Sequence, residues 1–288
     1  MSGAGRAVAP FGRRLLEVRG LDELGAYRIL RLADPDGPEP AAGQFAMLAA
    51  AERWGGGEGE RPFLPRAFSI ARSQGGEAHY LLEGVGPGTQ RLCELSAGEK
   101  VWVHGPLGHG FSAPEQGRRA ILTGGGVGIA PLAILQDQLE REGLQTLVLL
   151  GFRDALRVPG AGLLRDARLA TDDGSAGHHG LVTDLLAAEL ERDRRVLVYA
   201  CGPAGMLEGI RALCERAGVP AQLALEAGMA CGFGACYGCV VPRRGGGYLR
   251  VCVDGPVLDA AELDHIDAHV GAPAYPVAGH PPFRGAGK

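Results

Sequence analysis

Four cysteines near the carboxyl end of the chain carry the clearest chemical pattern. Three of them stand in CGFGACYGCVVP, residues 231–242, and the fourth follows in LRVCVDGP. Their spacing, Cys-x4-Cys-x2-Cys-x12-Cys, is typical of the ligands of a plant-type 2Fe-2S cluster. The candidate iron ligands are Cys231, Cys236, Cys239 and Cys252.

Glycine fills the spaces between these cysteines, at positions 232, 234 and 238. Glycine takes positive φ angles at little cost, so the backbone N–H groups of such a loop can turn toward sulfur. Structural zinc is the alternative, although zinc sites usually combine two Cys-x2-Cys pairs and this segment has one. Free thiols are a third interpretation, and the spacing favours the iron cluster over both.

A glycine-rich loop upstream is typical of phosphate binding. In TGGGVGIAPL, residues 123–132, a strand runs into a helix whose first N–H groups a pyrophosphate could approach. The glycines that would allow this approach are Gly124, Gly125, Gly126 and Gly128. A tight strand-to-helix turn is the alternative, because the spacing differs from the full G-x-G-x-x-G pattern.

A second phosphate site is predicted from RAFSIA and EGVGPGTQRL. Gly86 and Gly88 lead to Thr89, which we expect to cap a helix whose first N–H groups hold a pyrophosphate. Arg66 would neutralise its charge. Ser69 is the right kind of group to hydrogen-bond a flat ring, although half-buried serines are common on any strand. Two phosphate sites imply two nucleotides.

The elements that must position these residues change in character along the chain. Short β-rich runs between Gly and Pro turns predict a small antiparallel barrel or sandwich up to about residue 114, interrupted at 51–62 by a loop expected to be mobile. From residue 118, apolar strands alternate with helices of period 3.6, which predicts a parallel α/β layer to about residue 220. Ligands bind at the carboxyl ends of such strands, so Cys201, Gly202 and Pro203 are expected beside the 123–132 loop.

Composition excludes several classes of protein. The 288 residues are 46% apolar and 22% charged, with a net charge of -4 and no dominant basic run, which argues against a nucleic-acid partner. No run reaches the roughly 18 apolar residues of a membrane helix, and the start has no signal-peptide core. We therefore expect a cytoplasmic protein that does not bind membranes.

The motifs, taken in order, bring a known family into view. RAFSI, GVGPGT, GPLGHGF, TGGGVGIAPL, YACGPAGML and the cysteine segment ending in CVDGPV resemble the electron-transfer subunits of NAD-dependent dihydroorotate dehydrogenase, within the ferredoxin-reductase superfamily. The resemblance spans about residues 14–260. It implies a multidomain fold: an antiparallel FAD-binding β-barrel (1–114), a parallel α/β NAD-binding domain (115–220) and a small 2Fe-2S domain (221–260). The Pro-, Gly- and His-rich composition of residues 261–288 predicts a flexible tail, which departs from the family.

The resemblance also assigns roles to single residues. It implies FAD contacts from Arg66, Phe68, Ser69, Gly86, Gly88 and Thr89. It implies contacts to the nicotinamide nucleotide from Gly124, Gly125, Gly126, Gly128, Cys201, Gly202, Pro203 and Met206, and it makes Glu226 a recurrent family position. Ala67 departs from the family, which usually has proline there, and this would loosen the strand slightly.

The electron path follows from what each group carries. A flavin accepts two electrons as a hydride and passes them on singly, whereas the cluster carries one, so FAD must lie between NAD and iron. The resemblance implies a partner, an FMN-containing catalytic subunit that oxidises dihydroorotate to orotate in pyrimidine synthesis, within a heterotetramer. Asp172 and Asp173 would repel a 2'-phosphate, so we expect NAD rather than NADP.

Three alternatives stay open at the level of the sequence. The first is a sibling subunit, the flavin subunit of a cytoplasmic hydrogenase or of an electron-bifurcating ferredoxin:NADP oxidoreductase. The second is a non-catalytic redox-sensing protein, and the third is a zinc-stabilised binding module. The histidines are expected to bind no metal: His178 and His179 as exposed loop residues, and His265, His269 and His280 in a solvated tail.

Overall fold

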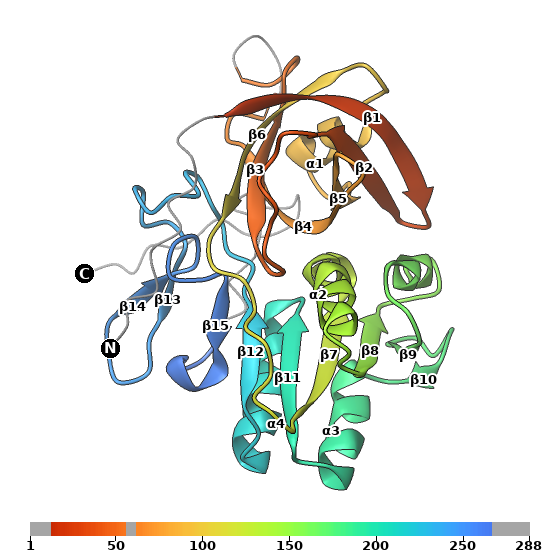
Figure 1. Ribbon diagram of the computed structural model, residues 1–288, viewed down its shortest axis with the longest axis vertical. Coiled ribbons are helices and arrows are strands. Elements are labelled where there is room, and N and C mark those ends of the chain that lie inside the picture. Colours follow the sequence, from red (N-terminus) through yellow and green to blue (C-terminus); the bar gives the residue numbers. More distant parts are fainter. Residues whose placement is uncertain (1–12, 56–61, 267–288) are drawn as a thin grey trace, which may run out of the picture.

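The first half of the chain folds into a closed antiparallel barrel (Figure 1). The structure is a computed structural model that describes residues 13–55 and 62–266. Six strands close in the order β1-β2-β5-β4-β3-β6, with a short helix between β5 and β6. They are β1 (Arg14–Leu24), β2 (Tyr27–Ala33), β3 (Phe45–Ala50), β4 (Arg66–Gln74), β5 (Glu77–Glu83), β6 (Lys100–Leu107) and the helix α1 (Pro87–Cys93).

Alternation of side chains builds the core of this barrel. On β6, Val101 and Val103 are fully buried inside, while Trp102 between them is partly exposed on the outer face. Successive side chains of a strand point to opposite faces, so this period of two directs the apolar set inward. The barrel therefore has an interior of its own and an outer face free to pack on other elements.

The second half of the chain forms a seven-stranded sheet in the order β10-β9-β8-β7-β11-β12-β15. The strands are β7 (Arg119–Gly125), β8 (Thr146–Phe152), β9 (Ala167–Thr171), β10 (His178–His179), β11 (Val196–Cys201), β12 (Ala221–Ala224) and β15 (Val257–Asp259). The helices are α2 (Ala130–Arg141), α3 (Val182–Arg192) and α4 (Ala204–Ala217), with 3-10 turns η1 (Gly126–Ile129), η2 (Val158–Leu163) and η3 (Ala260–Glu262). A separate hairpin pairs β13 (Val240–Pro242) with β14 (Tyr248–Arg250).

Helices cover both faces of this sheet. Apolar residues of α2 share one core with one face of β7, β8 and β11, whereas α3 and α4 pack on the other face (Figure 1). All residues of β11 are buried, as expected of a parallel strand covered on both sides. The strands from β10 to β12 run parallel, and β15 joins β12 as an antiparallel edge strand.

The barrel and the sheet share apolar contacts. Tyr27, Ala71 and Leu81 of the barrel belong to the core that contains α2, and the backbone N–H of Ala26 donates to Leu156 at 3.0 Å. An ion pair of 2.8 Å between Arg157 and Glu83 crosses the same boundary. The barrel thus packs on the face of the sheet that α2 covers.

The predicted fold class is confirmed: an antiparallel barrel, a parallel sheet with helices, and a small carboxyl-terminal segment. The domain limits stay predictions, and β12 and β15 continue the sheet beyond residue 220. The expected flexible tail falls almost wholly outside the described residues, as do His269, His280 and positions 56–61 of the predicted mobile loop. No helix within the described ranges is long and apolar enough to cross a membrane.

Candidate functional site

The two predicted nucleotide loops meet at the carboxyl ends of adjacent strands. Gly124 of β7 lies opposite Cys201 of β11 in the parallel ladder. Beyond the strands the loops touch through their backbones, because a Cβ atom built on Gly128 would lie 2.5 Å from the Cα of Gly202. Only glycine at position 128 allows this approach. The chain thus brings Gly124–Gly128 and Cys201–Pro203 together, as a dinucleotide site requires.

Met206 lies against this junction from the first turn of α4. A Cβ on Gly125 would meet its sulfur at 2.7 Å, and one on Gly202 would meet its terminal methyl group. By contrast, a Cβ on Gly126 would meet nothing within 4 Å, so this part of the loop faces open space. The hydroxyl of Thr123 at the start of the loop is buried and has no hydrogen-bond partner among the described residues.

Cys201 at this junction and Glu226 near it are two ionisable groups whose pKa values are shifted. Burial raises the pKa of the Cys201 thiol well above its ordinary value, and the nearby charge of Glu226 raises it further. The side chain of Glu226 is exposed to solvent, yet protein encloses it closely enough that desolvation raises its carboxyl pKa. Glu226 thus lies close enough to Cys201 for its charge to act on that thiol, and its contact with a nucleotide stays a prediction.

The predicted flavin residues gather at the start of β4 and of α1. A Cβ on Gly88 would lie 2.7 Å from Nε of Arg66, so the guanidinium lies across the first turn of α1. Arg66 also donates to the carbonyl of Leu64 at 2.5 Å. Phe68 packs against the barrel core, and Ser69 is half-buried on the same strand. These positions agree with a phosphate held by Arg66 and a ring held along β4.

Thr89 caps helix α1 from its third position, so the expectation that Thr89 precedes the helix is wrong. Helix α1 begins after Gly86, which is extended, and Pro87 occupies its first turn. The Thr89 hydroxyl instead accepts hydrogen bonds from the N–H groups of Gly86 at 3.0 Å and Val85 at 2.9 Å. Thr89 therefore closes the turn from inside the helix. Pro87 was the signal for the earlier start, because proline is favoured at the first helical position.

The four cysteines are brought together as two pairs. Cys239 and Cys252 are buried, and the Cys252 N–H donates to the Cys239 sulfur at 3.5 Å. A hydrogen bond from the Cys252 thiol lowers the pKa of Cys239 and raises that of Cys252. Cys236 is exposed, Cys231 is half-buried, and their side chains also hydrogen-bond each other. One pair thus lies inside the protein and the other at its surface.

Backbone donors surround the outer pair. Burial raises the pKa of Cys231, but N–H groups of Phe233, Cys236 and Ala235 outweigh it and lower the value to about 7. The N–H of Gly238 points to the Cys236 sulfur at 3.4 Å. Donors of this kind stabilise a thiolate, which is the form that binds metal.

The paired arrangement fits two iron atoms better than one zinc ion. No group of three or more His, Cys, Asp or Glu side chains within residues 13–55 and 62–266 is arranged to hold a single ion. A tetrahedral zinc site needs four ligands around one point. A 2Fe-2S cluster with four cysteine ligands needs two on each iron. The sulfur chemistry and the backbone donors around it fit such a cluster, which Cys231, Cys236, Cys239 and Cys252 would hold.

The glycines of the cysteine loop serve different purposes. Gly232 and Gly234 have positive φ angles of 78° and 86°, as their spacing predicts. The expectation is wrong for Gly238, whose φ is not positive; Tyr237 takes the positive angle of 56° beside it. A Cβ on Gly232 would lie 2.7 Å from Met47, so this glycine also lets the loop press against the barrel.

Comparison with known proteins identifies the family. Residues 226–264 match the model described as the iron-sulfur cluster binding domain of dihydroorotate dehydrogenase B. The dihydroorotate dehydrogenase B (NAD(+)) electron transfer subunit of Caldanaerobacter subterraneus subsp. tengcongensis is 37% identical over 232 residues, 79% of this chain and 88% of that protein. The chain belongs to the family of dihydroorotate dehydrogenase B electron transfer subunits.

Further relatives agree with this dihydroorotate dehydrogenase B family. The subunit of the same name from Bacillus caldolyticus is 41% identical over 213 residues, 70% of this chain and 80% of that protein. A solved structure of an NADH-dependent reduced ferredoxin-NADP oxidoreductase, studied for flavin-based electron bifurcation, matches with a TM-score of 0.74 and 27% identity. It covers 88% of this chain and 91% of that one. The resemblance inferred from the motifs is confirmed at the level of family and fold.

The remaining acidic and histidine residues predicted from the sequence lie near the β10 edge of the sheet. Asp172 and Asp173 are exposed just after β9, and hydrogen bonds from Ser175 lower the pKa of Asp173. His178 and His179 are exposed, as expected, but they form the edge strand β10 rather than a loop. They were missed as a strand because two residues are too short for any periodicity.

Proposed function

We propose that this chain is the electron-transfer subunit of a dihydroorotate dehydrogenase, passing electrons between a partner subunit and NAD through a 2Fe-2S cluster and FAD. One observation carries the proposal. The inner cysteines Cys239 and Cys252 share a single apolar core with Met47 and Leu107 of the barrel and with the central sheet. The iron site therefore adjoins both nucleotide-binding parts within one folded unit.

The order of the carriers follows from their chemistry. When bound, FAD accepts a hydride from NADH and hands electrons on singly, and the cluster carries one at a time. The residues proposed to hold FAD are Arg66, Phe68, Ser69, Gly86, Gly88 and Thr89. Those proposed for NAD are Gly124, Gly125, Gly126, Gly128, Cys201, Gly202, Pro203 and Met206, with Glu226 near Cys201. Asp172 and Asp173 would disfavour a 2'-phosphate, which supports NAD over NADP.

The partner is proposed from the relatives' name. An electron transfer subunit implies a catalytic subunit, and we propose an FMN-containing dihydroorotate dehydrogenase joined to this chain in a heterotetramer. The exposed Cys236 would bring the outer iron to the surface where such a partner could accept or supply electrons. All seven cysteines are free, which agrees with a reducing compartment, the cytoplasm.

A second candidate has one specific observation in its favour. The match with the solved ferredoxin-NADP oxidoreductase spans 91% of that protein's chain. The same architecture therefore also serves electron bifurcation. Its identity of 27% is nevertheless well below the 37% and 41% of the dihydroorotate dehydrogenase relatives. We therefore rank the dihydroorotate dehydrogenase function first.

The test is anaerobic purification followed by visible spectroscopy and assay with the catalytic subunit. Flavin and two irons per chain, bleaching by NADH, and dihydroorotate-dependent reduction of NAD+ in the mixed subunits are the expected results. A colourless or zinc-containing protein would overturn the cofactor assignment. Bleaching by NADH without any transfer from the dihydroorotate dehydrogenase subunit, but with transfer to ferredoxin, would favour the second candidate.

A further inference from the structure

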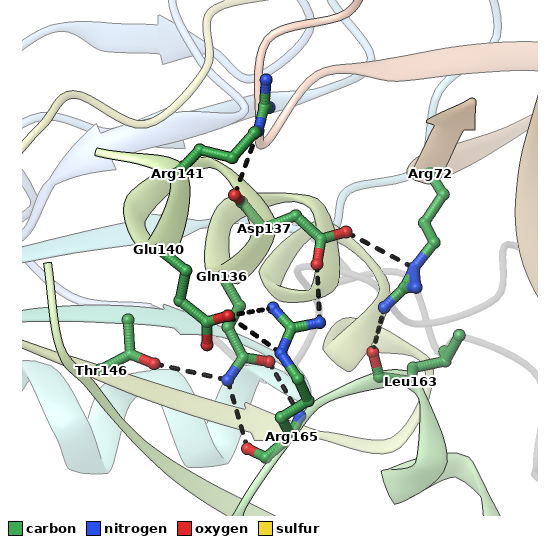
Figure 2. Close-up of polar contacts among 8 residues, drawn as sticks. All are labelled: Arg72, Gln136, Asp137, Glu140, Arg141, Thr146, Leu163 and Arg165. Carbon is green, nitrogen blue, oxygen red and sulfur yellow. Dashed lines mark hydrogen bonds and ion pairs between the residues drawn. The ribbon is translucent and has the colours of Figure 1, made fainter. Parts of the chain in front are cut away.

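One arginine of the barrel reaches across to the α/β layer. Arg72, near the end of β4, donates from Nη2 to the carbonyl oxygen of Leu163 at 2.6 Å. Its Nε lies 3.7 Å from a carboxylate oxygen of Asp137 on α2 (Figure 2). Strand β4 packs directly against α2 at this place. A single barrel side chain thus contacts both the helix and the end of η2.

The two elements joined by Arg72 each lead to a predicted cofactor site. Arg66 and Ser69, proposed to contact flavin, stand at the beginning of β4. Helix α2 continues directly from η1, which contains Gly126 and Gly128 of the proposed NAD loop. A shift between Arg72 and Asp137 displaces β4 against α2, and each of these elements leads to one of the two sites. The inference rests on the proposed function, because it concerns how these two sites are aligned.

Apolar packing alone does not set this alignment. Ala71 and Tyr27 of the barrel share a core with Ile129 and Ala133, but hydrophobic contact has no preferred direction. Hydrogen bonds and ion pairs are directional. The Arg72 Nε is buried and has no hydrogen-bond partner in the described part of the chain, although Asp137 stands just beyond bonding range. An unpaired buried donor is costly, so closer approach of the barrel to α2 is favoured.

Asp137 has a second charged partner on its own side of the boundary. Arg165 contacts its other carboxylate oxygen at 2.9 Å and also binds Glu140 at 2.5 Å (Figure 2). The buried Gln136 pairs with the backbone of Arg165, accepting from its N–H at 2.9 Å and donating to its carbonyl at 3.2 Å. Arg165 therefore stabilises the same carboxylate without reaching the barrel. It supplies a matched control for Arg72.

We propose that Arg72 and Asp137 are positioning residues that set the distance and angle between nicotinamide and flavin for hydride transfer. In that step the hydride, with its two electrons, leaves NADH, which becomes NAD+, and joins the oxidised flavin. Neither residue is among those proposed to hold a cofactor. The pair fixes β4, which carries proposed flavin residues, against α2, which continues from the proposed NAD loop.

The test compares Arg72→Met with Arg165→Met in the cofactor-loaded full chain, by anaerobic stopped-flow reduction of the flavin with NADH. Arg72→Met should lower the limiting rate about tenfold, since small misplacements of reacting groups cost large factors in rate. The NADH concentration for half-maximal rate should stay within about twofold, because the binding loops themselves are unchanged. Arg72→Lys, which keeps a donor for Leu163, should recover part of the rate. An unchanged rate in Arg72→Met, or an equal loss in Arg165→Met, would overturn the proposal.

A second measurement does not depend on turnover. Hydrogen exchange of the same proteins without NADH should be faster at the amides of residues 126–132 in Arg72→Met and in Asp137→Asn, but not in Arg165→Met. Slow hydride transfer with unchanged exchange would show that Arg72 acts otherwise. If NADH fails to reduce the wild-type flavin, the proposed function fails, and the exchange comparison alone then decides whether Arg72 joins the two elements.

Discussion

Residues 123–128 run from the buried end of strand β7 into the turn η1. Residues 226–239, by contrast, contain no helix or strand. The first segment is fixed by ladder hydrogen bonds on both sides and by backbone contact between Gly128 and Gly202. The second is held by packing of Gly232 on Met47 and by contacts among its own cysteines. A sheet can shape a nucleotide site before any ligand arrives. The cysteine loop needs its cluster to complete it.

Removing an inner cysteine should test this difference most severely. Cys239→Ser takes one sulfur from the buried pair, and we expect loss of nearly all bound iron and of the cluster absorbance. Flavin reduction by NADH should stay within about twofold of wild type, because an intact barrel and sheet still align the two nucleotides. Iron analysis and stopped-flow spectroscopy measure the two effects. Full iron content in the variant would contradict the ligand assignment.

Cys93→Ser is the matched control for that substitution. Cys93 lies at the end of α1 and is half-buried, but it is far in sequence from the cysteine loop. It should keep both iron and flavin reduction. The comparison separates a ligand from an ordinary buried thiol.

The same contrast explains what the sequence could predict. The strands at residues 45–50 and 146–152 were visible as apolar runs, and the cysteine ligands as a spacing. The turn at Thr89 was misassigned because its hydroxyl bonds backward. The positive φ of Tyr237 falls on a residue type that rarely adopts it, so no residue pattern indicates it. The contact of Arg72 with Asp137 joins segments far apart in the chain, so no local pattern could reveal it.

Crowding the two nucleotide loops should slow flavin reduction by NADH and leave the cysteine loop unaffected. In Gly128→Ala the added methyl would lie 2.5 Å from backbone atoms of Gly202, so one loop must shift. We expect flavin reduction by NADH to fall about a hundredfold, with iron content unchanged. Gly205→Ala in α4, where a Cβ meets nothing within 4 Å, should be harmless. Equal rates in the two variants would contradict the close packing of the loops.

A smaller effect is expected from the carboxylate between the two regions. Enclosure raises the pKa of Glu226, so its folded form binds protons more tightly than its unfolded form. Wild-type stability should therefore fall as pH rises from the ordinary glutamate value of about 4.3 through the raised folded value. Glu226→Gln should remove that fall, so that the variant is more stable than wild type at pH 8 and similar to it at pH 4. Denaturant unfolding at both pH values measures this, and identical pH profiles would count against the enclosed carboxylate.

The smallest effect concerns the joint between barrel and sheet. Arg157 pairs with Glu83 across this boundary at 2.8 Å, and both side chains are about four-fifths buried, at 23% and 22% exposed. Arg157→Met keeps the aliphatic stem but leaves Glu83 unpaired, so we expect a loss of about 1 kcal/mol in unfolding free energy. Arg19→Met breaks an exposed pair with Glu17 within the barrel and should cost less than about 0.5 kcal/mol. Because the apolar core carries most of the joint, neither variant should change iron content. A loss in Arg157→Met no larger than in Arg19→Met would mean that the Arg157–Glu83 pair does not stabilise the joint.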